Sequence, residues 1–135
     1  MKYWLIKSDP DTYGWDEMKK DKKTFWDGVR NYAARNHMKD MKKGDLCLFY
    51  HSQLKPPHIT GVVEVVKEHY QDPTTEDDRW VAVDVKYKRS FKNLVTLDDI
   101  KQRKGLANMV LLRISRLSVQ PVKKTEFDTI VKMGS

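Results

Sequence analysis

The chain has 135 residues, of which 39% are hydrophobic and 33% charged, and this composition excludes a disordered protein and favours one globular domain spanning residues 1–135. Lysine and arginine outnumber aspartate and glutamate by 26 to 19. The resulting net charge of +7 favours polyanionic partners, because binding would release condensed counterions, but charge alone does not decide the partner.

Apolar periodicity and turn-forming residues predict about five strands separated by short helices. The segment 80–88 alternates apolar and polar residues, and Thr96 with Asp99 three residues later resembles a helix capping box. The last strand changes phase near Ser115 and Arg116, which predicts a bulge at a barrel corner. The predicted strands are 3–7, 46–52, 61–70, 80–88 and 109–122, and the predicted helices are 15–21, 29–41, 96–104 and 125–133.

This order of elements predicts an α+β fold rather than a doubly wound parallel sheet. Consecutive strands begin at 46, 61 and 80, which favours neighbouring strands in one curved sheet. We therefore expect a small, partly open, mixed β-barrel with helices packed at its sides.

Cysteine content and the N-terminal segment indicate the compartment. Cys47 is the single cysteine and lies between apolar neighbours, so we expect a buried hydrophobe in a reducing environment. The first residues resemble neither a secretory signal nor a membrane anchor. We expect a cytoplasmic monomer that does not contact a membrane.

Residues 25–38, FWDGVRNYAARNHM, carry more hydrogen-bonding and stacking side chains than a packing helix needs. On the predicted helix, Asn31 and Arg35 lie at the edge of an apolar stripe, where a half-buried pocket would be built. Capping of turns and covering of the barrel rim explain these residues equally well. Gly28 allows an abrupt turn that leaves Trp26 at a corner, where its ring could stack on a flat ligand or pack in the core.

A second cluster, FYHS at 49–52, lies where a predicted strand ends at a loop, a place that often carries binding groups. Tyr50 and Ser52 share one face of this strand, and His51 lies on the other. Two clusters that combine aromatic and polar groups are uncommon in one small domain, which favours a binding site.

Residue patterns typical of catalysis are missing from the sequence. The 4 histidines lack metal-ligand spacing, and there is no phosphate-binding glycine loop and no nucleophile motif. The acidic pairs at 77–78 and 98–99 are better explained by solvation and helix capping than by acid–base chemistry. We therefore expect no metal, no cofactor and no catalysis, and a binding module is favoured over an enzyme.

Six segments carry a family resemblance: YWLIKSDPD, WDGVRNYAARN, FYHS, GVVEVVKE, DRWVAVDVKY and LSVQPV. Together they resemble the EVE domain family, which belongs to the PUA-like superfamily together with the YTH readers. The resemblance extends over essentially the whole chain, and the segments at 26–36 and 49–52 are the most specific. One departure is KSDPD, where the family often has KSEP.

The resemblance implies a PUA-like barrel whose pocket accepts an extruded modified base. A modified cytosine in DNA, such as 5-methylcytosine, is favoured, and modified RNA is the alternative. Such a base needs an aromatic face, edge contacts and cations for the flanking phosphates. The expected pocket residues are Ser8, Trp26, Asn31, Tyr32, Tyr50, His51 and Ser52, and the expected phosphate-binding residues are Lys7, Arg30 and Arg35.

Two other hypotheses remain open. PUA-like relatives include small amidohydrolases that act on acylated cytidine, and Lys7 beside a pocket could activate a nucleophile. The domain could instead be a protein-interaction barrel whose polar helix is only a rim, in which case Trp26→Ala would unfold it. Trp80 is expected to pack rather than to join the pocket, and Trp4 is expected in the core.

Overall fold

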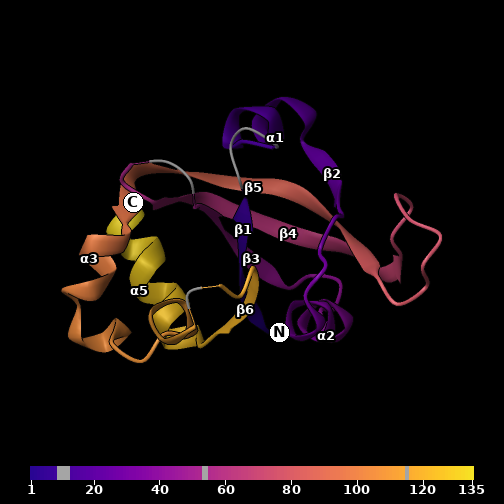
Figure 1. Cartoon of the computed structure of the whole chain (residues 1–135). Coiled ribbons are helices and arrows are strands. Elements are labelled where there is room, and N and C mark those ends of the chain that lie inside the picture. Colours follow the sequence, from indigo (N-terminus) through magenta and orange to yellow (C-terminus); the bar gives the residue numbers. More distant parts are fainter. Residues whose placement is uncertain (9–12, 53–54, 115) are drawn as a thin grey trace.

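The computed structural model describes residues 1–8, 13–52, 55–114 and 116–135, and over these ranges the chain forms one mixed sheet of six strands flanked by helices (Figure 1). The strand order is β2-β5-β4-β3-β1-β6. β1 pairs with β3 in parallel, whereas the other neighbours are antiparallel. The expected α+β fold with a mixed sheet is therefore confirmed.

The six strands differ greatly in length, because β4 and β5 form one long hairpin that extends beyond the rest of the sheet (Figure 1). Register shifts occur along the β4–β5 pairing, and such irregularities increase local twist. The strands are β1 Tyr3–Ser8, β2 Lys23–Trp26, β3 Leu46–His51, β4 His58–Gln71, β5 Val81–Thr96 and β6 Val119–Val122.

Helices cover both faces of this sheet. In Figure 1, α3 and α5 lie together at the left, and α2 lies at the lower right near the N-terminus. The helices are α1 Trp15–Asp21, α2 Tyr32–Asp40, α3 Leu97–Lys101, α4 Val110–Arg113 and α5 Lys124–Gly134, with a 3₁₀ turn at Lys104–Leu106. Within the described ranges, no helix has both the length and the apolar composition needed to cross a bilayer.

Two hydrophobic cores form because side chains alternate between the faces of each strand. Phe49 of β3 packs with Trp26, Ala34 and Met38 on the face covered by α1 and α2. Its neighbours in the chain, Leu48 and Tyr50, belong to the core on the opposite face, under α3, α4 and α5. Cys47 is fully buried, as expected from its apolar neighbours, and Trp4 also lies in the core.

The sheet remains open, because β2 and β6 are its two edges and they do not pair with each other. Helix α2 contacts both β5 and β6 and so spans the opening. Its buried residues Ala34 and Met38 face the core. This arrangement leaves a seam between the end of β2 and the segment that precedes β6.

The prediction of one long strand at 109–122 was wrong. Residues Val110–Arg113 form helix α4, and the strand β6 is limited to Val119–Val122. The apolar residues of this region cover the core under α3 and α5, which a helical turn satisfies as well as a strand would. The predicted bulge falls partly on Ser115, outside the described residues, and there is no continuous strand in which it could lie.

Other predicted boundaries shifted for local reasons. The strand predicted at 80–88 continues to Thr96, and β2 was not predicted as a separate strand. The capping box at Thr96 is confirmed: its hydroxyl accepts the Asp99 N–H at 3.1 Å, and the Asp99 carboxylate accepts the Thr96 N–H at 3.2 Å. The helix predicted at 29–41 begins only at Tyr32, because Asn31 is its N-cap.

Candidate functional site

The turn between β2 and α2 depends on Gly28 and Asn31. Gly28 has φ +75°, a left-handed conformation that favours glycine. Asn31 is extended, and its side-chain oxygen accepts the backbone N–H of Ala34 at 3.0 Å. This N-cap fixes where α2 begins, and the loop between β2 and α2 therefore lies at the seam of the sheet.

Trp26 is the last residue of β2, and its ring contacts the hydrophobic core on one side and a cavity on the other. Its ring is 9% exposed and meets Phe49 edge-on at 5.5 Å and Tyr13 at 6.3 Å between ring centroids. The remaining surface of Trp26 faces a cavity. The side chain therefore serves both the core and a candidate binding site.

The cavity beside Trp26, which we call the Trp26 pocket, has a volume of about 370 Å³, within the range of small-molecule sites. It lies at the seam between β2, the end of β1 and the segment before β6. Backbone pairing continues there, because the N–H of Lys7 donates to the carbonyl of Ser118 at 2.9 Å. Its lining residues are Lys7, Ser8, Tyr13, Thr24, Phe25, Trp26, Asp27, Gly28, Val29, Arg30 and Ser118.

The structure brings four of the predicted site residues together in this pocket: Lys7, Ser8, Trp26 and Arg30. The hydroxyl of Ser8, a buried residue, donates to the carbonyl of Tyr13. Lys7 lines the pocket, its ammonium lies toward the Tyr50 ring, and burial lowers its pKa.

The remaining predicted residues lie elsewhere. Tyr50 belongs to the core on the other face of the sheet, although the Lys7 ammonium lies 5.8 Å from its ring centroid. His51 is buried, and its Nε2 accepts the backbone N–H of Trp15 at 3.1 Å. Ser52 is half-buried, and its hydroxyl donates to the carbonyl of Ser8 at 3.4 Å.

The residues predicted on α2 also line no part of the pocket. Asn31 caps the helix, and Tyr32 is exposed on its outer side. Arg35 stacks on the Tyr32 ring, with its guanidinium carbon 5.0 Å from the ring centroid. Base binding by Asn31 and Tyr32 and phosphate binding by Arg35 stay predictions, whereas Lys7, Ser8, Trp26 and Arg30 all line one pocket.

Asp72 is the residue that the sequence did not reveal. Its carboxylate is fully buried and accepts four hydrogen bonds: from the Gly28 N–H at 2.8 Å, from Arg30 at 3.0 Å, and from the Thr74 N–H and hydroxyl at 2.7 and 2.5 Å. Burial alone would raise the pKa of Asp72, but the hydrogen bonds from Thr74, Gly28 and Arg30 lower it to about 2. Asp72 thus ties the pocket loop to the β4–β5 hairpin.

Other pocket residues were missed because their local sequence looks ordinary. Tyr13 follows the SDPD turn, Thr24 follows a run of lysines, and Ser118 lies in a segment predicted as a strand interior. The signal that could have found Asp27 was its place between a corner tryptophan and a turn glycine.

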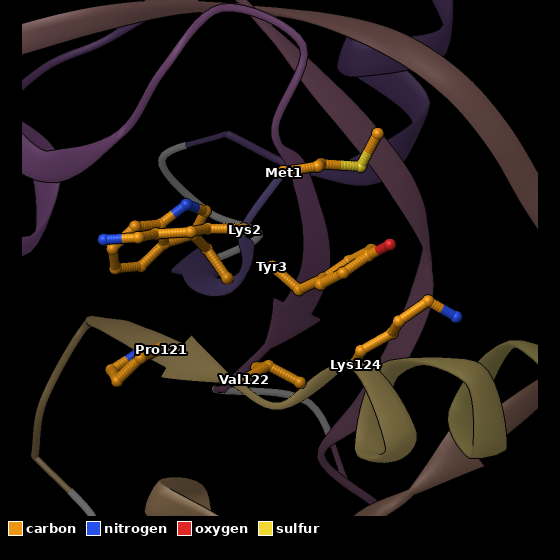
Figure 2. A pocket seen from close by; sticks show the side chains of 7 residues that line it. Met1, Lys2, Tyr3, Pro121, Val122 and Lys124 are labelled. Atoms are coloured by element: carbon orange, nitrogen blue, oxygen red, sulfur yellow. The ribbon is translucent and has the colours of Figure 1, made fainter.

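A second hollow, of about 430 Å³, lies where β1 begins beside β6 (Figure 2). Met1 and Lys124 lie near the ring of Tyr3, which packs on Phe127 with centroids 4.5 Å apart. This hollow contains none of the predicted site residues. We therefore take the Trp26 pocket as the candidate site.

Among the described residues, no three His, Cys, Asp or Glu side chains gather as metal ligands would. The His51 and His58 rings lie 5.5 Å apart. Desolvation and the neighbouring His58 lower the pKa of His51. His51 is thus a buried hydrogen-bond acceptor in this structure.

Comparison with known proteins decides the family. The EVE domain family model matches residues 2–133. The chain belongs to the EVE domain family. Human thymocyte nuclear protein 1 is similar to this EVE domain, with 35% identity over 97% of this chain and 73% of that protein.

Solved structures agree with this assignment. A hypothetical protein from Leishmania major has 41% identity and a TM-score of 0.94, covering 99% of this chain and 94% of that chain. The human THYN1 protein, solved in complex with DNA containing 5-methylcytosine, has 33% identity and a TM-score of 0.92, covering 100% of this chain and 98% of that chain. A YTH domain from Zygosaccharomyces rouxii has 15% identity and a TM-score of 0.63, and this likeness supports the PUA-like fold alone.

The left-handed turn of this EVE domain can be tested by Gly28→Ala. No atom lies within 4 Å of a Cβ placed at Gly28, so the cost should come from its positive φ and amount to about 1–2 kcal/mol of unfolding free energy. Gly105→Ala is the matched control, because its Cβ also meets nothing within 4 Å and its φ is not positive. Urea denaturation of both variants measures the difference, and equal stabilities would contradict the argument.

Proposed function

We propose that this EVE domain is a non-catalytic module that binds nucleic acid by accepting an extruded, modified base in the Trp26 pocket. The observation that carries the proposal is the pocket itself, whose lining includes the Trp26 ring, the serines Ser8 and Ser118 and the basic residues Lys7 and Arg30. The similarity to the human THYN1 protein in complex with DNA containing 5-methylcytosine supports a modified cytosine in DNA as the ligand.

Each chemical requirement of an extruded base has a matching group. Trp26 supplies an aromatic surface, and stacking is worth about 1–3 kcal/mol per base, which helps to offset the cost of extrusion. The hydroxyls of Ser8 and Ser118 offer polar contacts. The Asp27 carboxylate can accept a hydrogen bond from the exocyclic amino group of cytosine, a pairing that proteins use to recognise this base.

The cations at the pocket suit the phosphates beside the base. Lys7 and Arg30 line the pocket, and the net charge of +7 provides a general attraction to polyanions. Arg30 is held by Asp72, so its guanidinium is oriented before a ligand arrives. Pre-orientation reduces the entropy lost on binding.

Titration with oligonucleotides tests the proposal. Matched DNA duplexes carrying either cytosine or 5-methylcytosine at one position, together with RNA of the same sequence, are titrated at three salt concentrations. We expect tighter binding to the modified DNA at every salt concentration, with all affinities falling as salt rises. Equal affinity for modified and unmodified strands would reduce the domain to a general polyanion binder.

The pocket also permits a second candidate function, an amidohydrolase acting on a modified nucleoside. The observation that favours it is Lys7, which lines the pocket with Ser8 and whose pKa is lowered by burial. Incubation with a panel of modified nucleosides, followed by mass analysis, distinguishes the two functions. Turnover that disappears in Lys7→Met would overturn the non-catalytic proposal.

The cytoplasmic location and the monomeric state of this EVE domain remain predictions.

A further inference from the structure

Outside the Trp26 pocket, three arginines and two aromatic rings form a cluster on one surface. We call it the arginine–aromatic cluster, and its members are Arg30, Tyr32, Arg35, Arg79 and Trp80. The residues come from the start of α2, from the loop before it and from the segment that leads into β5. Arg30 also lines the pocket, so the cluster adjoins the candidate site.

The cluster alternates cations and rings. Tyr32 and Trp80 lie 5.1 Å apart with an angle of 34° between their planes. Arg35 stacks on Tyr32 at 5.0 Å, while Arg30 and Arg79 lie 5.7 and 5.9 Å from the Trp80 ring. The guanidinium of Arg79 also donates to the Tyr32 hydroxyl at 3.0 Å.

Ordinary packing does not account for this arrangement, because its members remain in contact with solvent. Tyr32 is 51% exposed, and Trp80 is only partly buried and belongs to neither hydrophobic core. Trp80 packs on the Tyr32 ring and beside surface arginines rather than in either core. Aromatic rings that are grouped at the surface, rather than scattered singly, are typical of an interaction site.

Among the described residues, two of the three arginines in the cluster are paired with carboxylates, and the third is not. Arg30 is held by the buried Asp72, and Arg79 pairs with Asp77 at 2.5 Å. Within the described ranges, Arg35 has no carboxylate within 4.0 Å and donates instead to Asn36 and to the carbonyl of Arg79. An arginine stacked on a ring keeps its N–H groups at the edge, where they can contact phosphate oxygens.

We propose that the arginine–aromatic cluster is a second subsite, which binds the nucleotide flanking the base held in the Trp26 pocket. Arg35 leaves the Tyr32 ring to contact its phosphate together with Arg79, and the base stacks on the ring face that Arg35 covers in the free domain. The inference rests on the proposed nucleic-acid function and adds a subsite to it. Tyr32 then lies outside the base pocket and contributes affinity without recognising the modification.

Tyr32→Ala is the decisive variant. Tyr32 is exposed in the first turn of α2, where alanine favours the helix, so we expect the domain to stay folded. Its affinity for oligonucleotides carrying 5-methylcytosine or cytosine should fall by the same factor, roughly 5- to 150-fold, which is the effect of losing one stacked base. Tyr32→Phe, which keeps the ring, should restore most of the affinity.

Arg79→Gln tests the phosphate contact. Lys39→Gln is the control, because Lys39 is an exposed cation near the end of α2 and lies outside the cluster. Arg79→Gln should weaken binding and make the salt dependence shallower by about 0.7–0.9 of a unit on a logarithmic plot. Lys39→Gln should leave the salt dependence nearly unchanged. Equal effects of the two variants would overturn the phosphate contact.

The outcomes separate this inference from the proposed function. Loss of discrimination between modified and plain strands in Tyr32→Ala would place Tyr32 in the base pocket and overturn the subsite, as would unchanged affinity. A wild-type domain that binds both strands equally would contradict base recognition, while the loss of affinity in Tyr32→Ala would still support the subsite. A wild-type domain that binds no oligonucleotide would overturn both.

Discussion

Trp26→Ala is expected to lower the unfolding free energy by about 3–5 kcal/mol, as buried tryptophan deletions typically do. The Trp26 ring is only 9% exposed and packs against both Phe49 and Tyr13. Removing it would leave a cavity between β2 and β3, at the wall of the pocket. Urea denaturation monitored by circular dichroism measures the loss, and a cost below about 1 kcal/mol would contradict the packing role.

A milder variant separates packing from binding. Trp26→Phe keeps an aromatic side chain in the core and should stay folded while losing about 1 kcal/mol of affinity for the modified strand, because the stacking surface is smaller. Trp15→Phe is the matched control, since Trp15 is 7% exposed in the same core but does not line the pocket. Binding lost equally in both variants would show that the effect comes from stability alone.

Asp72→Ala should destabilise the domain by about 3 kcal/mol, since it removes the acceptor of four hydrogen bonds. The Gly28 N–H and the Arg30 guanidinium would lose the partner that fixes the pocket loop. Chemical denaturation measures the change in stability. Asp78→Ala, in the same loop and exposed, is the control and should cost less than about 0.5 kcal/mol. A similar cost for both would show that the buried position is irrelevant.

The same carboxylate predicts a pH dependence. The pKa of Asp72 is about 2 in the folded domain and about 3.9 in an unfolded chain, so its stabilisation is present above pH ~4 and is lost as the pH falls toward 2. The shift corresponds to roughly 2–3 kcal/mol. The stability of wild type relative to Asp72→Asn should therefore shrink by that amount between pH ~5 and ~2. A constant difference over that interval would contradict the assigned pKa.

The sequence predicted the family and much of the sheet, because both can be recognised from the residue patterns of short segments. Alternation at 80–88 marked a strand whose apolar residues reach the core, and the segment at 26–36 identified the EVE domain. The capping box at Thr96 was also readable, since its hydrogen bonds join residues three apart. Such patterns depend on the period of one helix or strand, and that period is set by the backbone.

The site was predicted only in part. Trp26 and Arg30 line the pocket, and the corner made by Gly28 explains why they could be found from the segment itself. Asn31 has the amide group expected of a base-contacting residue, but it caps α2. Trp26→Ala therefore does not separate a binding module from an interaction barrel, because Trp26 supports the core in either case.

What only the tertiary structure decided are contacts between distant segments. Arg30 and Asp72 are 42 positions apart, and a hairpin brings them within 3.0 Å. The periodicity of a helix or strand gives no information about such a distant pair. The sequence QDPTTEDD, which contains Asp72, is equally compatible with a solvated loop. The helical turn at Val110–Arg113 was missed for a related reason: short apolar runs fit a strand or a helix, and packing against the core chooses between them. The sequence therefore determined the family and most of the elements, whereas tertiary packing decided the short elements β2 and α4 and which side chains meet at the site.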